Sequence, residues 1–138
     1  MKEIPEVNIF VRFCETDAAG HVSNVSYYMY FEEARTKFFD LLSIGTQKEK
    51  GDLSFIIAST KCDYVNQAFA KQTLIVSTKV AKIGIKSFTM EHEIKCAKTG
   101  SLIAVGNAVI VCFDFVEQQT REIPPELRRD LEQYLVSV

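Results

Sequence analysis

The spacing of apolar residues changes twice along this chain, and that change limits the possible folds more than any other feature. In the first segment apolar side chains alternate with polar ones, as in a strand with one buried face: Val7, Ile9, Val11 and Phe13. From residue 27 to about residue 42 they recur at helical spacing instead, which predicts one long amphipathic helix. Strand-like segments then return at roughly 53–64, 73–82, 86–97 and 102–115.

This order predicts an α+β fold, an antiparallel five-stranded sheet wrapped around one long central helix. The segment LIAVGNAVIVCFDF at 102–115 is apolar on both faces, so it should be covered on both sides or buried at a subunit contact. We therefore expect two subunits that join edge to edge or pack together. Pro124-Pro125-Glu126 predicts the start of a short C-terminal helix.

Turn residues separate the later strands. Ile83-Gly84-Ile85 and Lys98-Thr99-Gly100-Ser101 are typical of hairpin turns, and Gly45 is a plausible stop for the long helix before a polar linker at 45–52. In the segment between the two turns, alternation places His92 on the same face as four apolar residues. We expect His92 to be a core histidine whose hydrogen bonds are satisfied.

Composition excludes several classes of function. The chain has 138 residues, which predicts a single domain over residues 1–138, and its 16 basic and 18 acidic residues form no basic run that would suggest nucleic-acid binding. The N-terminus lacks the apolar core of a signal peptide, and no apolar run is long enough to cross a membrane, so we expect a soluble, cytoplasmic protein. Four dispersed cysteines, without a CxxC pair, predict neither a zinc site nor a disulfide framework.

The stretch CETDAAGHVSN, residues 14–24, holds the chemistry of interest because it joins the first strand to the long helix. A carboxylate such as Asp17 can attack a thioester or remove a proton from water. Free amides at the start of a helix can stabilise the developing oxyanion. Asn24 or Ser26 is suited to cap that helix, and Gly20 would let the backbone approach a ligand closely.

Plainer interpretations of the same residues stay open. Asp17 can serve as a turn or capping residue, and Asn24 and Ser26 can be caps without a role in a site. A histidine in a loop, such as His21, is commonly a surface residue held by a hydrogen bond. Alternation from Asp17 suggests that Glu15 points elsewhere.

The run VRFCETDAAGHVSNVSYYMYFEEAR, residues 11–35, resembles the signature of the hot-dog-fold acyl-CoA thioesterases of the 4-hydroxybenzoyl-CoA thioesterase type. The resemblance extends more loosely to FIIASTKCDYVNQA and KIGIKSFTMEHEI. It implies a hot-dog fold, a homodimer or homotetramer with active sites at the subunit interface, and hydrolysis of acyl-CoA without a metal or cofactor. By the same resemblance, Asp17 is the catalytic nucleophile or general base, the backbone N–H of Asn24 polarises the thioester carbonyl, and His21 is a further candidate catalytic residue.

The resemblance also suggests which residues bind substrate. Tyr27 and Tyr28 would shape the acyl pocket or its rim, and Gly20 would let the substrate approach the backbone closely. Lys82, Lys86 and Ser87 would meet the phosphates and pantetheine arm of CoA. A solvated hairpin explains those lysines equally well. The chain departs from many relatives at residues 67–72, where QAFAKQ replaces a Pro and a Gly-Asp, and this leaves a second catalytic carboxylate from that loop in question.

Two alternative functions remain at this point: an acyl-thioester hydratase or dehydratase that pairs His21 with Asp17, and a non-enzymatic acyl-CoA-binding domain. The sequence does not specify the acyl group, and it does not separate CoA from an acyl carrier protein.

Overall fold

The computed structural model describes residues 2–42 and 53–136. In chain order the elements are β1 (Val7–Phe10), the 3-10 helix η1 (Phe13–Glu15), α1 (Asn24–Phe39), β2 (Leu53–Tyr64), β3 (Thr73–Ile83), β4 (Ser87–Cys96), β5 (Leu102–Asp114), β6 (Gln119–Thr120) and α2 (Pro125–Tyr134).

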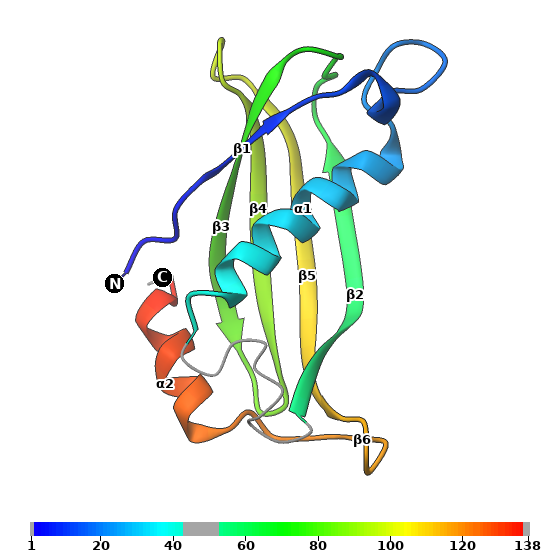
Figure 1. The fold of residues 1–138 in the computed structure, drawn as a ribbon. Coiled ribbons are helices and arrows are strands. Elements are labelled where there is room, and N and C mark those ends of the chain that lie inside the picture. The colour runs from blue at the N-terminus through cyan, green and yellow to red at the C-terminus, as the bar shows by residue number, and fades with distance from the viewer. Residues whose placement is uncertain (1, 43–52, 137–138) are drawn as a thin grey trace.

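The strands form one antiparallel sheet in the order β1-β3-β4-β5-β2, and the two-residue β6 pairs with β5. The sheet curls, α1 lies across one of its faces, and α2 lies near the end of the sheet where β3 meets β4 (Figure 1). The predicted α+β fold is therefore confirmed. The helices of the described part of the chain include none long and apolar enough to cross a membrane.

The bounds of β2 to β5 agree with the sequence prediction to within a residue, but the first strand is shorter than predicted. β1 ends at Phe10, and the chain then turns through η1. Phe13 is 86% exposed, so its assignment to the buried face of the first strand was wrong. Alternation failed there because η1 changes the direction of successive side chains.

The helix α1 begins at Asn24, three residues before the predicted start, and ends at Phe39. Its cap is Ser23, whose side chain accepts a hydrogen bond from the Ser26 amide, so neither Asn24 nor Ser26 is the capping residue. Gly45 and the predicted linker at 45–52 lie outside the described residues.

The buried core consists of two apolar clusters, both covered by α1. One contains Val11, Tyr27 and Ala104, and the other contains Phe38, Met90 and Leu131 of α2. A row of three residues crosses the sheet between them, because Thr78 pairs with His92 and His92 pairs with Gly106. We call Thr78, His92 and Gly106 the dividing row.

His92 is buried as predicted, but its hydrogen bonds are not all satisfied. Its Nδ1 lies 3.0 Å from the Thr78 hydroxyl, and its ring stacks on Phe31 with centroids 5.4 Å apart. The Nε2 atom has no hydrogen-bond partner among the described residues. Phe31 also lies against Gly106, where an added Cβ would be 2.6 Å from the ring.

One long edge and one face of the sheet are left open by this chain. β2 pairs with β5 alone, so its other edge is unpaired among the described residues. On β5, alternate side chains are buried under α1 and the remainder are half-buried on the opposite face. The chain thus covers β5 on one face only, and cover on both faces would require a subunit contact.

Candidate active site

The residues after η1 form a small hairpin with Asp17 at its first corner. Thr16 and Val22 pair across it, the Asp17 amide donates to the His21 carbonyl at 2.7 Å, and the Gly20 amide donates to the Asp17 carbonyl at 3.0 Å. Gly20 has a φ of +84°, a backbone conformation that favours glycine. An added Cβ at Gly20 would meet no atom of the described chain within 4 Å, so the turn itself requires the glycine. We call residues 16–22 the Asp17 hairpin.

The carboxylate of Asp17 is held by the hairpin through one of its oxygens. Oδ1 accepts hydrogen bonds from the Ala19 amide at 2.9 Å and the His21 amide at 3.1 Å. Among the described residues, Oδ2 accepts no hydrogen bond. Asp17 therefore closes the turn, as its plainer interpretation requires, and still offers an oriented oxygen to solvent or to a ligand.

His21 meets Asp17 through its backbone and not through its ring. Its imidazole is half-exposed and packs edge-on against Phe69, with ring centroids 5.0 Å apart. A histidine and a carboxylate that act together need a hydrogen bond between their side chains. This chain forms no such bond between His21 and Asp17.

The start of α1 follows the Asp17 hairpin directly. The amides of Ser26 and Tyr27 donate to the Ser23 carbonyl, whereas the first-turn amides of Asn24 and Val25 have no carbonyl of the helix to bond. Both of these residues are exposed. Free amides at the positive end of a helix suit a carbonyl oxygen that gains negative charge.

Aromatic residues lie beside this helix start. Tyr27 is buried, and its ring is 5.3 Å from that of Tyr64 on β2, while Tyr28 is partly exposed and touches Phe31. Burial raises the pKa of Tyr27, and the nearby Cys62 and Asp17 groups add to that effect. Sequence reasoning had named Tyr27 and Tyr28 as site residues but not Tyr64, although Tyr64 lies in the second segment that resembles the family, FIIASTKCDYVNQA.

The predicted CoA contacts lie elsewhere in the same chain. Lys82, Lys86 and Ser87 flank the β3–β4 connection, which is at the opposite end of the sheet from the Asp17 hairpin (Figure 1). The Gly84 amide donates to the Ser87 carbonyl at 2.7 Å, and Lys86 Nζ lies 3.4 Å from the Thr120 hydroxyl. One chain does not bring these residues together with Asp17.

The segment that departs from the family pattern does contact the Asp17 hairpin. The Val22 amide donates to the Ala68 carbonyl at 2.8 Å, and His21 pairs with Phe69. Lys71 adopts a φ of 73°, which a non-glycine residue adopts rarely. The hairpin is therefore held from this side by backbone pairing, and residues 67–72 contain no carboxylate.

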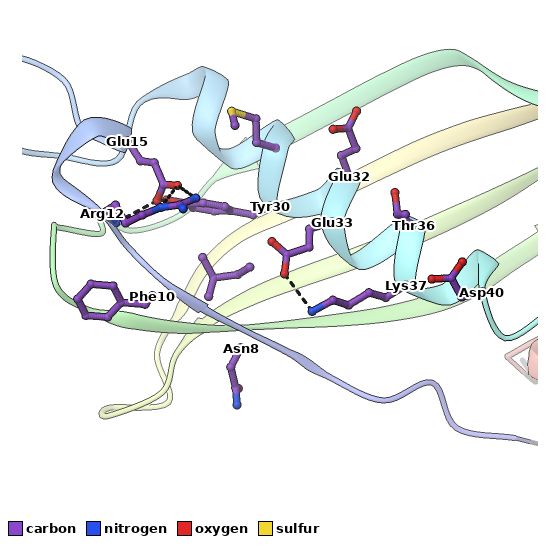
Figure 2. Close-up of a pocket in the computed structure, with 12 residues that line it drawn as sticks. Asn8, Phe10, Arg12, Glu15, Tyr30, Glu32, Glu33, Thr36, Lys37 and Asp40 are labelled. Carbon is purple, nitrogen blue, oxygen red and sulfur yellow. Dashed lines mark hydrogen bonds and ion pairs between the residues drawn. The ribbon is translucent and has the colours of Figure 1, made fainter. Parts of the chain in front are cut away.

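Glu15 was not predicted to take part, yet it is the buried carboxylate of this region. Its side chain is 6% exposed and binds Arg12 and Tyr30 (Figure 2). These three residues line an open groove of about 710 Å³ between β1 and α1, together with Phe10 and Glu33. The described chain contains no group of three or more His, Cys, Asp or Glu residues that could hold a metal ion.

The chain matches a known protein family over most of its length. Residues 11–131 match the model of the thioesterase-like superfamily. This chain belongs to that superfamily. The match includes the Asp17 hairpin, α1 and all four long strands, so the resemblance found in residues 11–35 is confirmed.

Individual superfamily members align over different shares of their length. The chain is 34% identical over 84 residues to the uncharacterized protein YsmA of Bacillus subtilis (strain 168), which covers 61% of this chain and 56% of that protein. It is 26% identical over 120 residues to the acyl-CoA thioesterase YbgC of Haemophilus influenzae, covering 86% of this chain and 87% of YbgC. A thioesterase from Thermus thermophilus, solved with coenzyme A and zinc, is 27% identical with a TM-score of 0.82, and the match covers 97% of this chain and 96% of that one.

Proposed function

We propose that this chain is an acyl-CoA thioesterase that hydrolyses an acyl-CoA thioester to the free acid and CoA, with Asp17 as the catalytic carboxylate. The observation that supports this assignment is the placement of an oriented, exposed carboxylate directly before a helix start with free amides. Family membership supports the reaction class, and the match over residues 11–131 supports treating residues 1–138 as one hot-dog domain.

In this proposal the thioester carbonyl lies against the amides of Asn24 and Val25 at the start of α1. As the carbonyl carbon is attacked, its oxygen gains negative charge, which those amides stabilise. Asp17 either attacks the carbon through Oδ2, and water then hydrolyses the resulting anhydride, or it removes a proton from the attacking water. In both cases the CoA thiolate leaves and takes up a proton.

The hydratase alternative is less well supported, because it needs the His21 ring to act with Asp17. That ring packs on Phe69 instead. The binding-only alternative predicts association with acyl-CoA but no release of free thiol, so a single assay separates it from hydrolysis.

We also propose that the active site is completed by a second copy of this chain, in a homodimer or homotetramer. Two observations support this: within the described ranges 2–42 and 53–136, β2 has an unpaired edge next to the aromatic residues at the start of α1, and Lys82, Lys86 and Ser87 lie at the far end of the sheet. A partner subunit that placed its own β3–β4 connection near Asp17 would supply the CoA contacts.

The test is thiol release from a panel of short, long, branched and aromatic acyl-CoAs, with the wild type, Asp17→Asn and the control Asp40→Asn. Asp40 is an exposed carboxylate at the other end of α1. We expect Asp17→Asn to lower kcat by about 100-fold or more while CoA binding is kept, as for loss of a general base, and Asp40→Asn to behave as the wild type. Wild-type turnover by Asp17→Asn would refute the assignment.

A further inference from the structure

We propose that Glu15 is the positioning residue of this site: its buried carboxylate fixes the Asp17 hairpin against the start of α1. This inference rests on the proposed function for its catalytic consequence, but its structural part can be tested independently. Among the described residues, the carboxylate of Glu15 forms hydrogen bonds with Arg12 and Tyr30 and none with Asp17, so it acts on Asp17 only through the backbone.

The side chain of Glu15 joins three parts of the fold. Oε1 accepts hydrogen bonds from the Arg12 amide at 3.0 Å and the Tyr30 hydroxyl at 2.9 Å, and Oε2 accepts two from the Arg12 guanidinium at 2.9 and 2.6 Å. Burial alone would raise the pKa of Glu15, but the hydrogen bonds from Arg12 and Tyr30 outweigh burial and hold that pKa below its usual value. The carboxylate is therefore kept ionised where it anchors η1 to the second turn of α1.

The backbone of Glu15 is attached to the first turn of the same helix. Its carbonyl accepts a hydrogen bond from the Ser23 amide at 3.0 Å and another from the Ser26 hydroxyl at 2.8 Å. Ser23 is the cap of α1, so one residue is bonded to α1 at its cap, its first turn and, through Tyr30, its second turn.

Asp17 follows Glu15 by two residues, and the Asp17 hairpin returns to Ser23 at its other end. The distance between the Asp17 carboxylate and the free amides of α1 is therefore set where the hairpin meets the helix, at the Glu15–Ser23 bond. A shift of about 1 Å between catalytic groups can lower a rate about 100-fold. We infer that Glu15 determines whether Asp17 and the helix start act on the same carbonyl.

Two variants test this role, and one variant serves as the control. Glu15→Gln removes the charge at nearly constant size, and Tyr30→Phe removes only the bond to the second turn of α1. Glu33→Gln is the control, because Glu33 is an exposed carboxylate on α1 that pairs with Lys37 at 3.1 Å. The readouts are amide hydrogen exchange by NMR and steady-state kinetics on the best acyl-CoA of the panel.

In Glu15→Gln we expect the amides of Asp17, Gly20 and His21 to exchange about tenfold faster, as for loss of a charged hydrogen bond, while the amides of β4 keep their rates. Tyr30→Phe should accelerate the same three amides by a smaller factor, and Glu33→Gln should change none. We expect kcat of Glu15→Gln to fall about 10- to 100-fold with KM within about threefold of wild type.

Unchanged exchange in the Asp17 hairpin of both variants would overturn the proposal, and so would an equal acceleration of the β4 amides, which would indicate a loss of global stability. If Asp17→Asn is inactive but Glu15→Gln keeps its kcat while the hairpin amides exchange faster, Glu15 does not position Asp17 for catalysis and the proposal is refuted. Should Asp17→Asn retain full activity, the proposed function fails, yet the exchange rates still decide whether Glu15 holds the hairpin.

Discussion

At the scale of single residues, Asp17 and Glu15 differ in their surroundings, and the roles proposed for them follow from that difference. Asp17 is exposed and is oriented by backbone amides at one oxygen, whereas Glu15 is buried and has donors at both oxygens. A group that reacts needs a free oxygen, and a group that anchors needs none. The environment of each carboxylate, more than its residue type, indicates which part it takes.

The buried His92 predicts a pH dependence of stability. Burial, together with the charge of Arg35, lowers its pKa to about 4 from the ordinary value of 6.5. Between pH 6.5 and 4 the His92 imidazole binds a proton in the unfolded chain but not in the folded chain. The contribution of the neutral His92 to the free energy of unfolding is therefore full above pH 6.5 and is lost as the pH falls toward 4. From about pH 7 to about pH 5 this amounts to about 2 kcal/mol.

Chemical unfolding of the wild type and His92→Gln at about pH 7 and about pH 5 measures this effect. Between these two pH values we expect the free energy of unfolding to fall by about 2 kcal/mol more in the wild type than in His92→Gln. Equal losses in the wild type and His92→Gln would show that His92 is not the group responsible.

The sequence indicated where the Asp17 hairpin lies in the chain, but not which contacts hold that hairpin against α1. Asp17, Gly20 and His21 form a local pattern, and a turn with its glycine can be inferred from adjacent residues. The bond from Glu15 to Tyr30 spans 15 positions and depends on the 3-10 turn at η1, which reverses the alternation that had pointed Glu15 away. Roles set by contacts across the fold leave no such local pattern.

At the scale of elements, the start of α1 provides a test of the cap. Ser23 caps the helix with its side chain, and Asn24 occupies the first helical position. Ser23→Ala should lower the free energy of unfolding by about 1 kcal/mol, the usual cost of losing a capping side chain. Asn24→Ala is the matched comparison and should change it by less than about 0.5 kcal/mol, as for an exposed helical residue.

Urea unfolding of both variants measures these changes. If the free energy of unfolding fell more in Asn24→Ala than in Ser23→Ala, Asn24 would be the capping residue, as one of the two sequence predictions had it. Local sequence could not decide between Ser23, Asn24 and Ser26, because all three residue types suit a cap. The Glu15 carbonyl, which binds the Ser23 amide and the Ser26 hydroxyl, favours Ser23.

The longer elements could be predicted because their period is sustained. β3 and β4 repeat the alternation over most of their eleven and ten residues, which averages out single exceptions. β2 and β5 are longer still, at twelve and thirteen residues, and turn residues mark the ends of these strands. β1 and β6 have four and two residues, too few for a period to be established securely. The exposed Phe13 was misassigned for that reason.

At the scale of the whole molecule, the edge of β2 to which no strand of the described residues pairs predicts association between subunits. A twelve-residue edge strand presents a row of unpaired backbone groups, to which another strand can pair. Ile57 lies on β2 and is 42% exposed. Ile57→Lys should therefore shift the protein toward the mass of one chain, 15.6 kDa, and lower hydrolysis with it if the site is shared.

Light scattering at several concentrations measures the mass. Val116→Lys, at an exposed apolar residue after β5, is the control and should leave the wild-type mass unchanged. A wild type that already has the mass of one chain would remove the proposed second copy from the active site. The cytoplasmic location expected from the sequence stays a prediction.

The dividing row has a consequence for changing this protein by design. The apolar cluster next to the Asp17 hairpin and the cluster under α2 are separated by Thr78, His92 and Gly106. Effects of distant substitutions that share no partner add. Stabilising changes under α2 can thus be combined with changes at the proposed acyl pocket beside Tyr27 without being optimised together. Libraries for substrate range and for heat tolerance can therefore be screened separately and then combined.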